Sequence, residues 1–399
     1  MKYDFTTIMN REGMDAIAVE QIPFENVTVK EGFSRIPMWI ADMNFATVPT
    51  VPKALIERAS HPAYGYFNIR EEYYQAIIDW QEKRHGVVGL TKECIGYENG
   101  VLGGVISALN VFCSKGDKVL VHSPVYIGFS MVLSNNGYQL VDSPLHRDED
   151  GIWRMDYEDM EEKLKTQHIH TAIVCSPHNP CGRVWEKWEL EKMMELYKKY
   201  DVQVICDEIW ADLTLDGHKH IPLQSISEDA KMRTMAFYAP SKTFNLAGLI
   251  GSYHIIYNQR LRDRIRKESS LSHYNSINVL SMHALIAAYG KEGHEWVDEL
   301  RCVLSENVDY AWNFITEHFK GISVAKPEGT YMLLLDCEQW CKEHNKTLDE
   351  LQKAGVEVGV IWQDGRAFYS PWGIRMNLAL PKTLVEEAMR RLQKYVLIP

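Results

Sequence analysis

Residues 239–248 read Ala-Pro-Ser-Lys-Thr-Phe-Asn-Leu-Ala-Gly and place Lys242 in a short connection. The runs on either side, 232–238 and 253–256, are apolar and have the composition of buried strands. A lysine is costly to desolvate, so such a position favours an amine with a chemical task, for example a Schiff base with a carbonyl cofactor. Because a lone lysine beside a serine is also typical of a solvated surface, other stretches must support this interpretation.

Two further apolar runs end in polar residues that can serve the same site. Residues 171–175 lead into Ser-Pro-His-Asn-Pro, which contains Asn179, and residues 202–206 end at Asp207. The carboxyl ends of parallel strands meet at one edge of an open α/β sheet, and ligands bind at that edge. We therefore expect Asn179, Asp207 and Lys242 to lie close together.

With these motifs the chain resembles the pyridoxal 5′-phosphate (PLP) enzymes of the aspartate aminotransferase fold, fold type I. Within the class I/II aminotransferases it is most similar to the carbon-sulfur lyases of the cystalysin and cystathionine β-lyase type, from about Asp4 to the C-terminal region. The resemblance implies an α/β fold with a mostly parallel seven-stranded sheet. It also implies a large PLP-binding domain, residues 46–285, and a smaller α+β domain formed by residues 1–45 and 286–399.

The resemblance assigns the catalytic roles to Lys242, Asp207 and Tyr126. Lys242 would carry PLP and then remove the Cα proton of an amino acid. Asp207 would keep the pyridine nitrogen protonated, which makes the ring an electron sink. Tyr126, just past the run 119–122, would stack on the ring, and Asn179 would donate to the phenolic oxygen of the cofactor.

Gly100, Gly103 and Gly104 stand just before a helical pattern through Ile106, Leu109 and Phe112, and together they predict an anion site. Backbone N–H groups at a helix N-terminus can approach an anion closely, and the helix dipole attracts it. We expect Gly100, Val101 and Leu102 to form this phosphate cradle. The resemblance adds Ser241, and Tyr64 from the second subunit of a homodimer; Tyr64 as a plain interface residue is the alternative.

Arg375 is flanked by apolar residues in the run 374–378 and needs a partner. A guanidinium can hold a carboxylate with two hydrogen bonds, which is what an α-amino acid substrate needs for orientation. The resemblance places the substrate-carboxylate arginine in this motif, and places Asn179 and the backbone around Ala41 beside it. A structural salt bridge is the alternative for Arg375.

Three positions depart from relatives. Ile127 stands where cystalysin-like enzymes often carry a second tyrosine, and Trp210, also expected at the cofactor, stands where they usually carry histidine and aminotransferases carry tyrosine. Ile250, eight residues after Lys242, replaces the phosphate-binding arginine of many aminotransferases, which favours the lyase branch. Trp210 could also line an apolar substrate pocket, together with Trp39, Trp362 and Trp372.

Three functions stay open at this point. The first is a carbon-sulfur β-lyase acting on cystathionine or another cysteine S-conjugate. The second is an aminotransferase or racemase acting on an α-amino acid, since these reactions share the loss of the Cα proton. The third is a non-catalytic regulator that keeps PLP as a ligand, because function does not follow from fold.

Composition limits the partners. The chain has 399 residues, a net charge of −11 and eight scattered cysteines, without a metal-type Cys-x-x-Cys pair. The acidic balance argues against nucleic acid and anionic membrane surfaces as partners. Free thiols, a polar N-terminus and the absence of an apolar run near ~18 residues predict a cytoplasmic protein without a metal site.

Amphipathic patterns predict helices over 71–84 and 185–200, and a longer one over 295–319 that begins the small domain.

Overall fold

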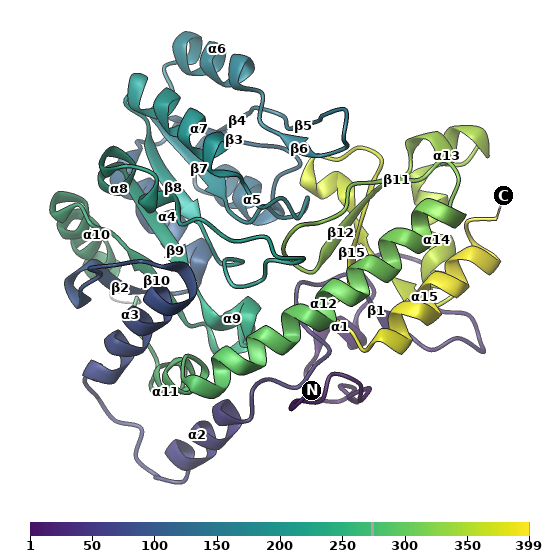
Figure 1. Ribbon diagram of the computed structural model, residues 1–399, viewed down its shortest axis with the longest axis horizontal. Coiled ribbons are helices and arrows are strands. Elements are labelled where there is room, and N and C mark those ends of the chain that lie inside the picture. The colour runs from purple at the N-terminus through teal and green to yellow at the C-terminus, as the bar shows by residue number, and fades with distance from the viewer. Residues whose placement is uncertain (273–274, 399) are drawn as a thin grey trace.

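The computed structural model describes residues 1–272 and 275–398, and within these ranges the central sheet has seven strands (Figure 1). Neighbouring strands are parallel except for β10, which is antiparallel to both of its neighbours, β2 and β9. This confirms the mostly parallel seven-stranded sheet. In sheet order the strands are β2 (Ile95–Glu98), β10 (Ser252–Ile255), β9 (Thr234–Tyr238), β8 (Gln203–Asp207), β7 (Thr171–Cys175), β3 (Lys118–Val121) and β4 (Gln139–Asp142).

The central strands β7, β8 and β9 are mostly apolar and almost fully buried because helices cover both faces of the sheet. In β7, Ile173 and Cys175 pack in one hydrophobic cluster with α4 (Val101–Phe112) and α5 (Ile127–Asn135). Ala172 and Val174 belong to a second cluster. The alternation follows from the two-residue period of a strand. The second cluster includes residues of α6 (Tyr157–Gln167) and α7 (Lys187–Lys199).

The second sheet is smaller and antiparallel, with the order β11-β12-β15-β14 among the described residues. Figure 1 shows the long helix α12 and the C-terminal helix α15 running across this part of the molecule. The elements are β11 (Ser323–Val324), β12 (Met332–Asp336), β14 (Gln363–Asp364), β15 (Gly373–Asn377), α12 (Lys291–His318), α13 (Glu338–Glu343), α14 (Leu348–Glu357) and α15 (Lys382–Tyr395).

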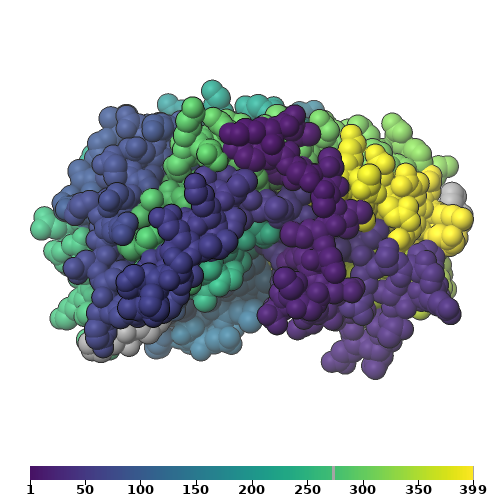
Figure 2. All heavy atoms as spheres, turned by 90° about the horizontal axis from the view of Figure 1, so that it is seen from below, coloured from purple at the N-terminus to yellow at the C-terminus, as the bar shows by residue number. Residues whose placement is uncertain are grey.

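The N-terminal segment joins the C-terminal part of the chain. β1 (Ile36–Pro37) pairs in parallel with β13 (Val360–Ile361). In Figure 2 the N-terminal residues lie across one face of the molecule, between the blue residues of the first hundred and the yellow C-terminal end. This pairing agrees with grouping residues 1–45 with 286–399, and the domain boundaries themselves stay a prediction.

The remaining elements lie around the two sheets. The sequence prediction for 71–84 corresponds to α3 and that for 185–200 to α7, whereas α12 begins four residues before the predicted 295. Gly293 lies within α12, where a close contact requires a glycine, because a Cβ would overlap the carbonyl oxygen of Ala288. The others are α1 (Ile17–Glu20), α2 (Thr50–Ala59), α3 (Glu71–His85), α8 (Glu228–Arg233), α9 (Pro240–Thr243), α10 (Gln259–Ser272), α11 (Val279–Ala288), β5 (His146–Arg147) and β6 (Trp153–Arg154).

All eight cysteines lie in the described part of the chain and are unpaired. None of the helices in that part is both long and apolar enough to cross a bilayer. Its histidine, cysteine and acidic side chains form no group of three or more that could hold a metal ion.

Candidate active site

A cavity of about 230 Å³ lies beyond the carboxyl ends of β7, β8 and β9. The structure brings most of the residues predicted from the sequence to its wall, and it adds several that the sequence did not single out. The predicted wall residues are Ala41, Gly100, Val101, Leu102, Tyr126, Asn179, Asp207, Trp210, Ser241 and Lys242, and Ile250, noted in the sequence for replacing an arginine, also lies there. The added ones are Cys175, Ile209, Ala239, Ala247, Gly251 and Ser252.

Lys242 lies in the single turn of α9, directly after β9. Its Nζ donates a hydrogen bond to the carbonyl oxygen of Ala41 at 2.7 Å. Burial lowers the pKa of the amine to about 8, and the charge of Arg375 lowers it further, while Asp42 and Asp207 oppose the shift. A substantial fraction of the amine is therefore neutral near pH 8, which is the form that attacks a carbonyl.

The turn that carries Lys242 is held from the side by a buried carboxylate. Thr243 Oγ1 donates to Asp212 Oδ2 at 2.8 Å, and Asp212 Oδ1 accepts from Trp80 Nε1 at 3.0 Å. His85 Nε2 lies 3.0 Å from the same oxygen. These contacts fix the backbone at position 243, so the neighbouring lysine leaves the turn in a defined direction.

Asp207 is the last residue of β8 and is 3% exposed. Its Oδ1 accepts a hydrogen bond from the amide of Ile209 at 3.0 Å, and no cation of the described residues forms an ion pair with it. Burial raises the pKa of the carboxyl to about 7, against the opposing effects of the Ile209 amide and the charge of Lys242. A buried carboxyl without an ionic partner is suited to a cationic or N–H group of a ligand.

The first turn of α4, predicted from the sequence as an anion-binding cradle, lies at the cavity wall. Gly100 is the N-cap and has φ +78°, and Val101 and Leu102 begin the helix at the cavity wall. The free N–H groups and the dipole of this helix attract an anion. Since Ile250 lines the wall in place of an arginine, Lys242 is the one cationic side chain among the described residues of the wall.

Arg375 lies on β15, is 4% exposed, and borders the cavity through Asn179. Its Nη1 donates to Asn179 Oδ1 at 3.3 Å, and its Nη2 donates to the carbonyl oxygen of Trp39 at 2.9 Å. The buried Nε has no partner, and no carboxylate within the described ranges forms an ion pair with the guanidinium. The structural salt bridge is thereby excluded for this part of the chain, and burial lowers the pKa of Arg375 to about 10.

Residues 38–45 form a strap beside the cavity, and polar side chains from several segments hold its backbone. Asn377 Nδ2 donates to the Ile40 carbonyl oxygen at 2.7 Å, and Asn245 Nδ2 donates to the Met43 carbonyl oxygen at 2.8 Å. Arg11 forms an ion pair with Asp42 at 2.6 Å. Together with the contacts of Lys242 and Arg375, these bonds explain how the strap presents backbone oxygens to the site.

Aromatic rings form two sides of the cavity. Tyr126 is the N-cap of α5. Burial raises the pKa of its phenol, so its hydroxyl group stays protonated near neutral pH. A Cβ on Gly128 would overlap the Tyr126 ring, so this glycine leaves room for it. The ring centre of Trp210 lies 5.8 Å from Lys242 Nζ, and Trp210 packs edge-on against Tyr331 at 4.7 Å.

Trp210 is the one member of the suggested tryptophan pocket that reaches the described cavity wall. Trp362 belongs to the core, because its indole donates to the Gln352 carbonyl oxygen at 3.0 Å and Gly355 packs against its ring. Trp39 donates to the Ala18 carbonyl oxygen at 3.0 Å, and Trp372 packs against the core. The suggested four-tryptophan pocket was therefore wrong, since helix and strand packing use the other indoles.

Tyr64 does not reach the cavity of its own chain. It is 57% exposed, and its hydroxyl donates to the Ala59 carbonyl oxygen at 2.9 Å. Tyr66 and Phe67 follow it and are also exposed. These aromatic side chains lie around a separate hollow that also includes Tyr97.

Sequence reasoning missed several functional neighbours. Cys175 and Ile209 line the cavity because each is adjacent to a strand end, a signal that was available in the sequence. Arg11 and Asn245 contact the site only indirectly, because they bond to Asp42 and Met43 of the strap. No local sequence pattern around either residue indicates these contacts.

The comparisons with known proteins agree with this geometry. The model of the aminotransferase class I and II family matches residues 37–392. The chain is 33% identical over 361 residues to cystathionine beta-lyase PatB of Bacillus subtilis strain 168, covering 90% of this chain and 92% of that protein.

Two solved structures, both with a TM-score of 0.90, are similar over nearly the full length. The PLP-bound C-S lyase from Staphylococcus hominis is 31% identical and covers 100% of this chain and 99% of its own. Cystalysin from Treponema denticola, which contains a pyridoxal 5′-phosphate cofactor, is 29% identical and covers 99% and 98%. The chain therefore belongs to the aminotransferase class I and II family and has its fold-type I architecture.

Proposed function

We propose that this protein is a PLP-dependent carbon-sulfur β-lyase that converts cystathionine or another cysteine S-conjugate to a thiol, pyruvate and ammonia. One observation carries the proposal: the amine of Lys242, with its lowered pKa, and the carboxyl of Asp207, without a cationic partner, line one cavity, and the guanidinium of Arg375, without an anionic partner, contacts Asn179 of its wall. Similarity to PatB and to the solved C-S lyases selects the lyase among the reactions such a site supports.

The residues around the cavity fit PLP. Lys242 would bind its aldehyde carbon, and the N-terminus of α4 with Ser241 would bind its phosphate. The unpaired carboxyl of Asp207 suits the protonated pyridine nitrogen. Tyr126 and Asn179 also line the cavity, where Tyr126 would stack on the ring and Asn179 would donate to the phenolic oxygen. When bound, this cofactor draws electrons from the Cα of an attached amino acid and so weakens its C–H bond.

The protein side chains would then orient the substrate and move one proton. Arg375 would bind the α-carboxylate through N–H groups that now contact Asn179 and Trp39. The Lys242 amine, with its pKa near 8, would take the proton from Cα. The thiolate then leaves from Cβ with the C–S bond electrons, and the three-carbon remainder reacts with water to give pyruvate and ammonia. Trp210 can donate a hydrogen bond here but cannot carry a proton.

The decisive experiment is a pyruvate assay with no keto-acid acceptor. We expect cystathionine or S-alkyl cysteines to release thiol and pyruvate in equal amounts. The Lys242→Ala variant should lose this activity, because it lacks both the attachment point and the base. Turnover that depends on a keto acid would instead assign the aminotransferase, the second candidate, which the family description supports. A yellow protein without turnover of any amino acid would indicate the regulator.

We also propose that the active unit is a homodimer in which Tyr64 completes the phosphate site of the other subunit. The exposed aromatic segment around Tyr64 supports this, as does a cavity wall whose one described cation is Lys242. A phosphate in that wall would gain a phenol donor from a second chain.

The unpaired cysteines, seven of them at least partly buried, support our proposal of a reducing, cytoplasmic compartment.

A further inference from the structure

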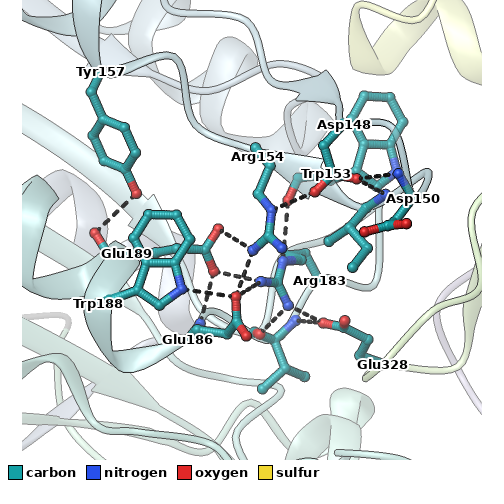
Figure 3. A network of polar contacts seen from close by, with 12 residues as sticks. Asp148, Asp150, Trp153, Arg154, Tyr157, Arg183, Glu186, Trp188, Glu189 and Glu328 are labelled. Atoms are coloured by element: carbon teal, nitrogen blue, oxygen red, sulfur yellow. Dashed lines mark hydrogen bonds and ion pairs between the residues drawn. The ribbon is translucent and has the colours of Figure 1, made fainter.

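Arg183 is a buried cation that the reaction does not use, four residues after Asn179. Its Nε donates to the Trp153 carbonyl oxygen at 3.1 Å, and its Nη1 donates to the Val184 carbonyl oxygen at 2.6 Å. The guanidinium also contacts three carboxylates, those of Glu186, Glu189 and Glu328 (Figure 3). All three guanidinium nitrogens of this arginine are engaged, so its position is tightly determined.

Glu328 reaches Arg183 from a different part of the fold. Glu186 and Glu189 belong to the N-terminal end of α7, close to Arg183 in sequence. Glu328 belongs to the connection that enters β12, and in Figure 3 its ribbon approaches the arginine from the side opposite to Glu186 and Glu189. The contact therefore joins two segments 145 residues apart.

Backbone hydrogen bonds join the same two segments beside the ion pair. We call this set of contacts between residues 182–184 and residues 327–329 the tie. The amides of Glu328 and Gly329 both donate to the Gly182 carbonyl oxygen, at 2.8 and 2.9 Å. A Cβ on Gly182 would overlap Pro327, so the two segments touch without space between them. Glu328 Oε2 additionally accepts from the Val184 amide at 3.0 Å.

The two tied segments are the ones that present Asn179 and Arg375. Asn179 and Arg183 share one loop, which the bridge between His178 and Arg183 closes. The segment after Glu328 becomes β12, whose Leu334 pairs with Arg375 on β15. Asn179 and Arg375 meet through one hydrogen bond of 3.3 Å, which is long for its type. The separation of the two side chains therefore depends on how the segments that carry them are held.

We propose that the Arg183–Glu328 ion pair is a positioning contact that sets the distance between Asn179 and Arg375 and thereby the affinity for the α-carboxylate of the substrate. This inference rests on the proposed function of Arg375. Arg183 and Glu328 are positioning residues, since neither lines the described cavity wall.

The test compares Glu328→Gln with Glu186→Gln in the PLP-loaded protein. Both substitutions remove one carboxylate from the same guanidinium, but Glu186 lies on the same side of the tie as Arg183. A glutamine at 328 keeps an oxygen acceptor for the Val184 amide. We expect Glu328→Gln to raise the KM for a cysteine S-conjugate about tenfold, with kcat within about twofold, because displaced binding groups weaken substrate binding. Glu186→Gln should leave both constants unchanged, and Glu328→Asp should give an intermediate KM.

A second readout uses cofactor-free protein. Hydrogen exchange of the Gly182 and Gly329 amides should be faster in Glu328→Gln than in Glu186→Gln, because the tie is loosened. Equal KM values in the two glutamine variants, or a loss of kcat at constant KM, would overturn the proposal. So would unchanged exchange. If the unsubstituted protein fails to cleave S-conjugates, the proposed function fails, and the exchange comparison still decides whether Glu328 maintains the tie.

Discussion

At the scale of single residues, the site contains two buried ionisable groups that lack ionic partners. Asp207 and Arg375 lie near Lys242, yet neither forms an ion pair with a side chain in the described ranges. Burying such groups without ionic partners costs stability, so their retention points to partners that a ligand supplies. The pyridine nitrogen and the α-carboxylate are the groups that the proposed function provides.

The Asp207→Asn variant tests this cost through pH. The difference between a pKa of about 7 in the folded protein and the ordinary 3.8 corresponds to about 4 kcal/mol. From pH 4 to pH 7 the unfolded chain loses this proton while the folded chain keeps it, so cofactor-free protein loses stability as pH rises. Because the amide introduced by the substitution does not titrate, the variant should gain stability relative to the unsubstituted protein over this range and keep the gain above pH 7.

Urea unfolding of both cofactor-free proteins at pH 4.5 and 8 measures the effect. The same variant should bind PLP weakly and turn over slowly. A stability difference that is the same at both pH values would contradict the assigned pKa.

The Arg375→Lys variant tests the carboxylate clamp. Lysine keeps the charge but cannot offer two parallel N–H donors, so we expect KM to rise by about 10-fold to 100-fold, since a hydrogen bond to a charged group contributes about 1.5–3 kcal/mol. Steady-state kinetics with an S-alkyl cysteine measure it. Arg391→Lys is the matched control: Arg391 is also buried but bonds Ser34 and Val358, so its loss should reduce stability without changing KM.

At the scale of elements, the proposed phosphate binding depends on the start of α4. Gly100 has φ +78° and ψ 155°, a region that side chains with a Cβ avoid, and a Cβ there would have no neighbour within 4 Å. A substitution at this glycine therefore acts through the backbone alone. The direction of the first N–H groups of α4 depends on this conformation.

The Gly100→Ala variant should weaken PLP binding by about 1–3 kcal/mol, the usual cost of such backbone strain. Titration of cofactor-free protein with PLP, followed by absorbance, measures the change. Gly86→Ala is the control, because Gly86 ends α3 with φ +68° and also has open space at its Cβ. That variant should lose stability and keep its PLP affinity. Equal losses of affinity in both would show that general destabilisation is the cause.

At the scale of the whole molecule, the proposed phosphate site would be completed by a second chain. The described wall holds one cationic side chain, and the Tyr64 hydroxyl points to a backbone oxygen of its own segment. Tyr66 and Phe67, which follow Tyr64, also have exposed rings, as we expect if this segment packs against the second subunit of the proposed homodimer. The second subunit would provide what the wall lacks.

Mixed dimers test this arrangement. Tyr64→Phe homodimers should bind PLP about threefold to tenfold more weakly, the effect of one lost hydrogen bond. Mixing them with Lys242→Ala subunits should restore a site of normal affinity and activity, since each Lys242 then faces an intact Tyr64. A mass in solution equal to one chain, or no restoration on mixing, would exclude the exchange of Tyr64.

Prediction from the sequence succeeded where the signal is local. β7, β8 and β9 are continuous apolar runs, and their last residues or following turns carry Asn179, Asp207 and Lys242. Prediction failed where residues of the same type differ only in their tertiary packing: Trp210 lines the cavity, while Trp362 belongs to the core. The start of α12 was placed at 295, four residues after its actual start at Lys291.

The sequence by itself determined where the buried strands lie along the chain, which polar residues follow their ends, and that a glycine precedes α4. Each of these features depends on residues close together in the chain. Only the tertiary structure decided which distant groups meet: Lys242 with Ala41, Thr243 with Asp212, and Arg183 with Glu328. The physical reason is that such contacts depend on the packing of whole elements, and the local pattern around either partner is the same whether or not the other is near.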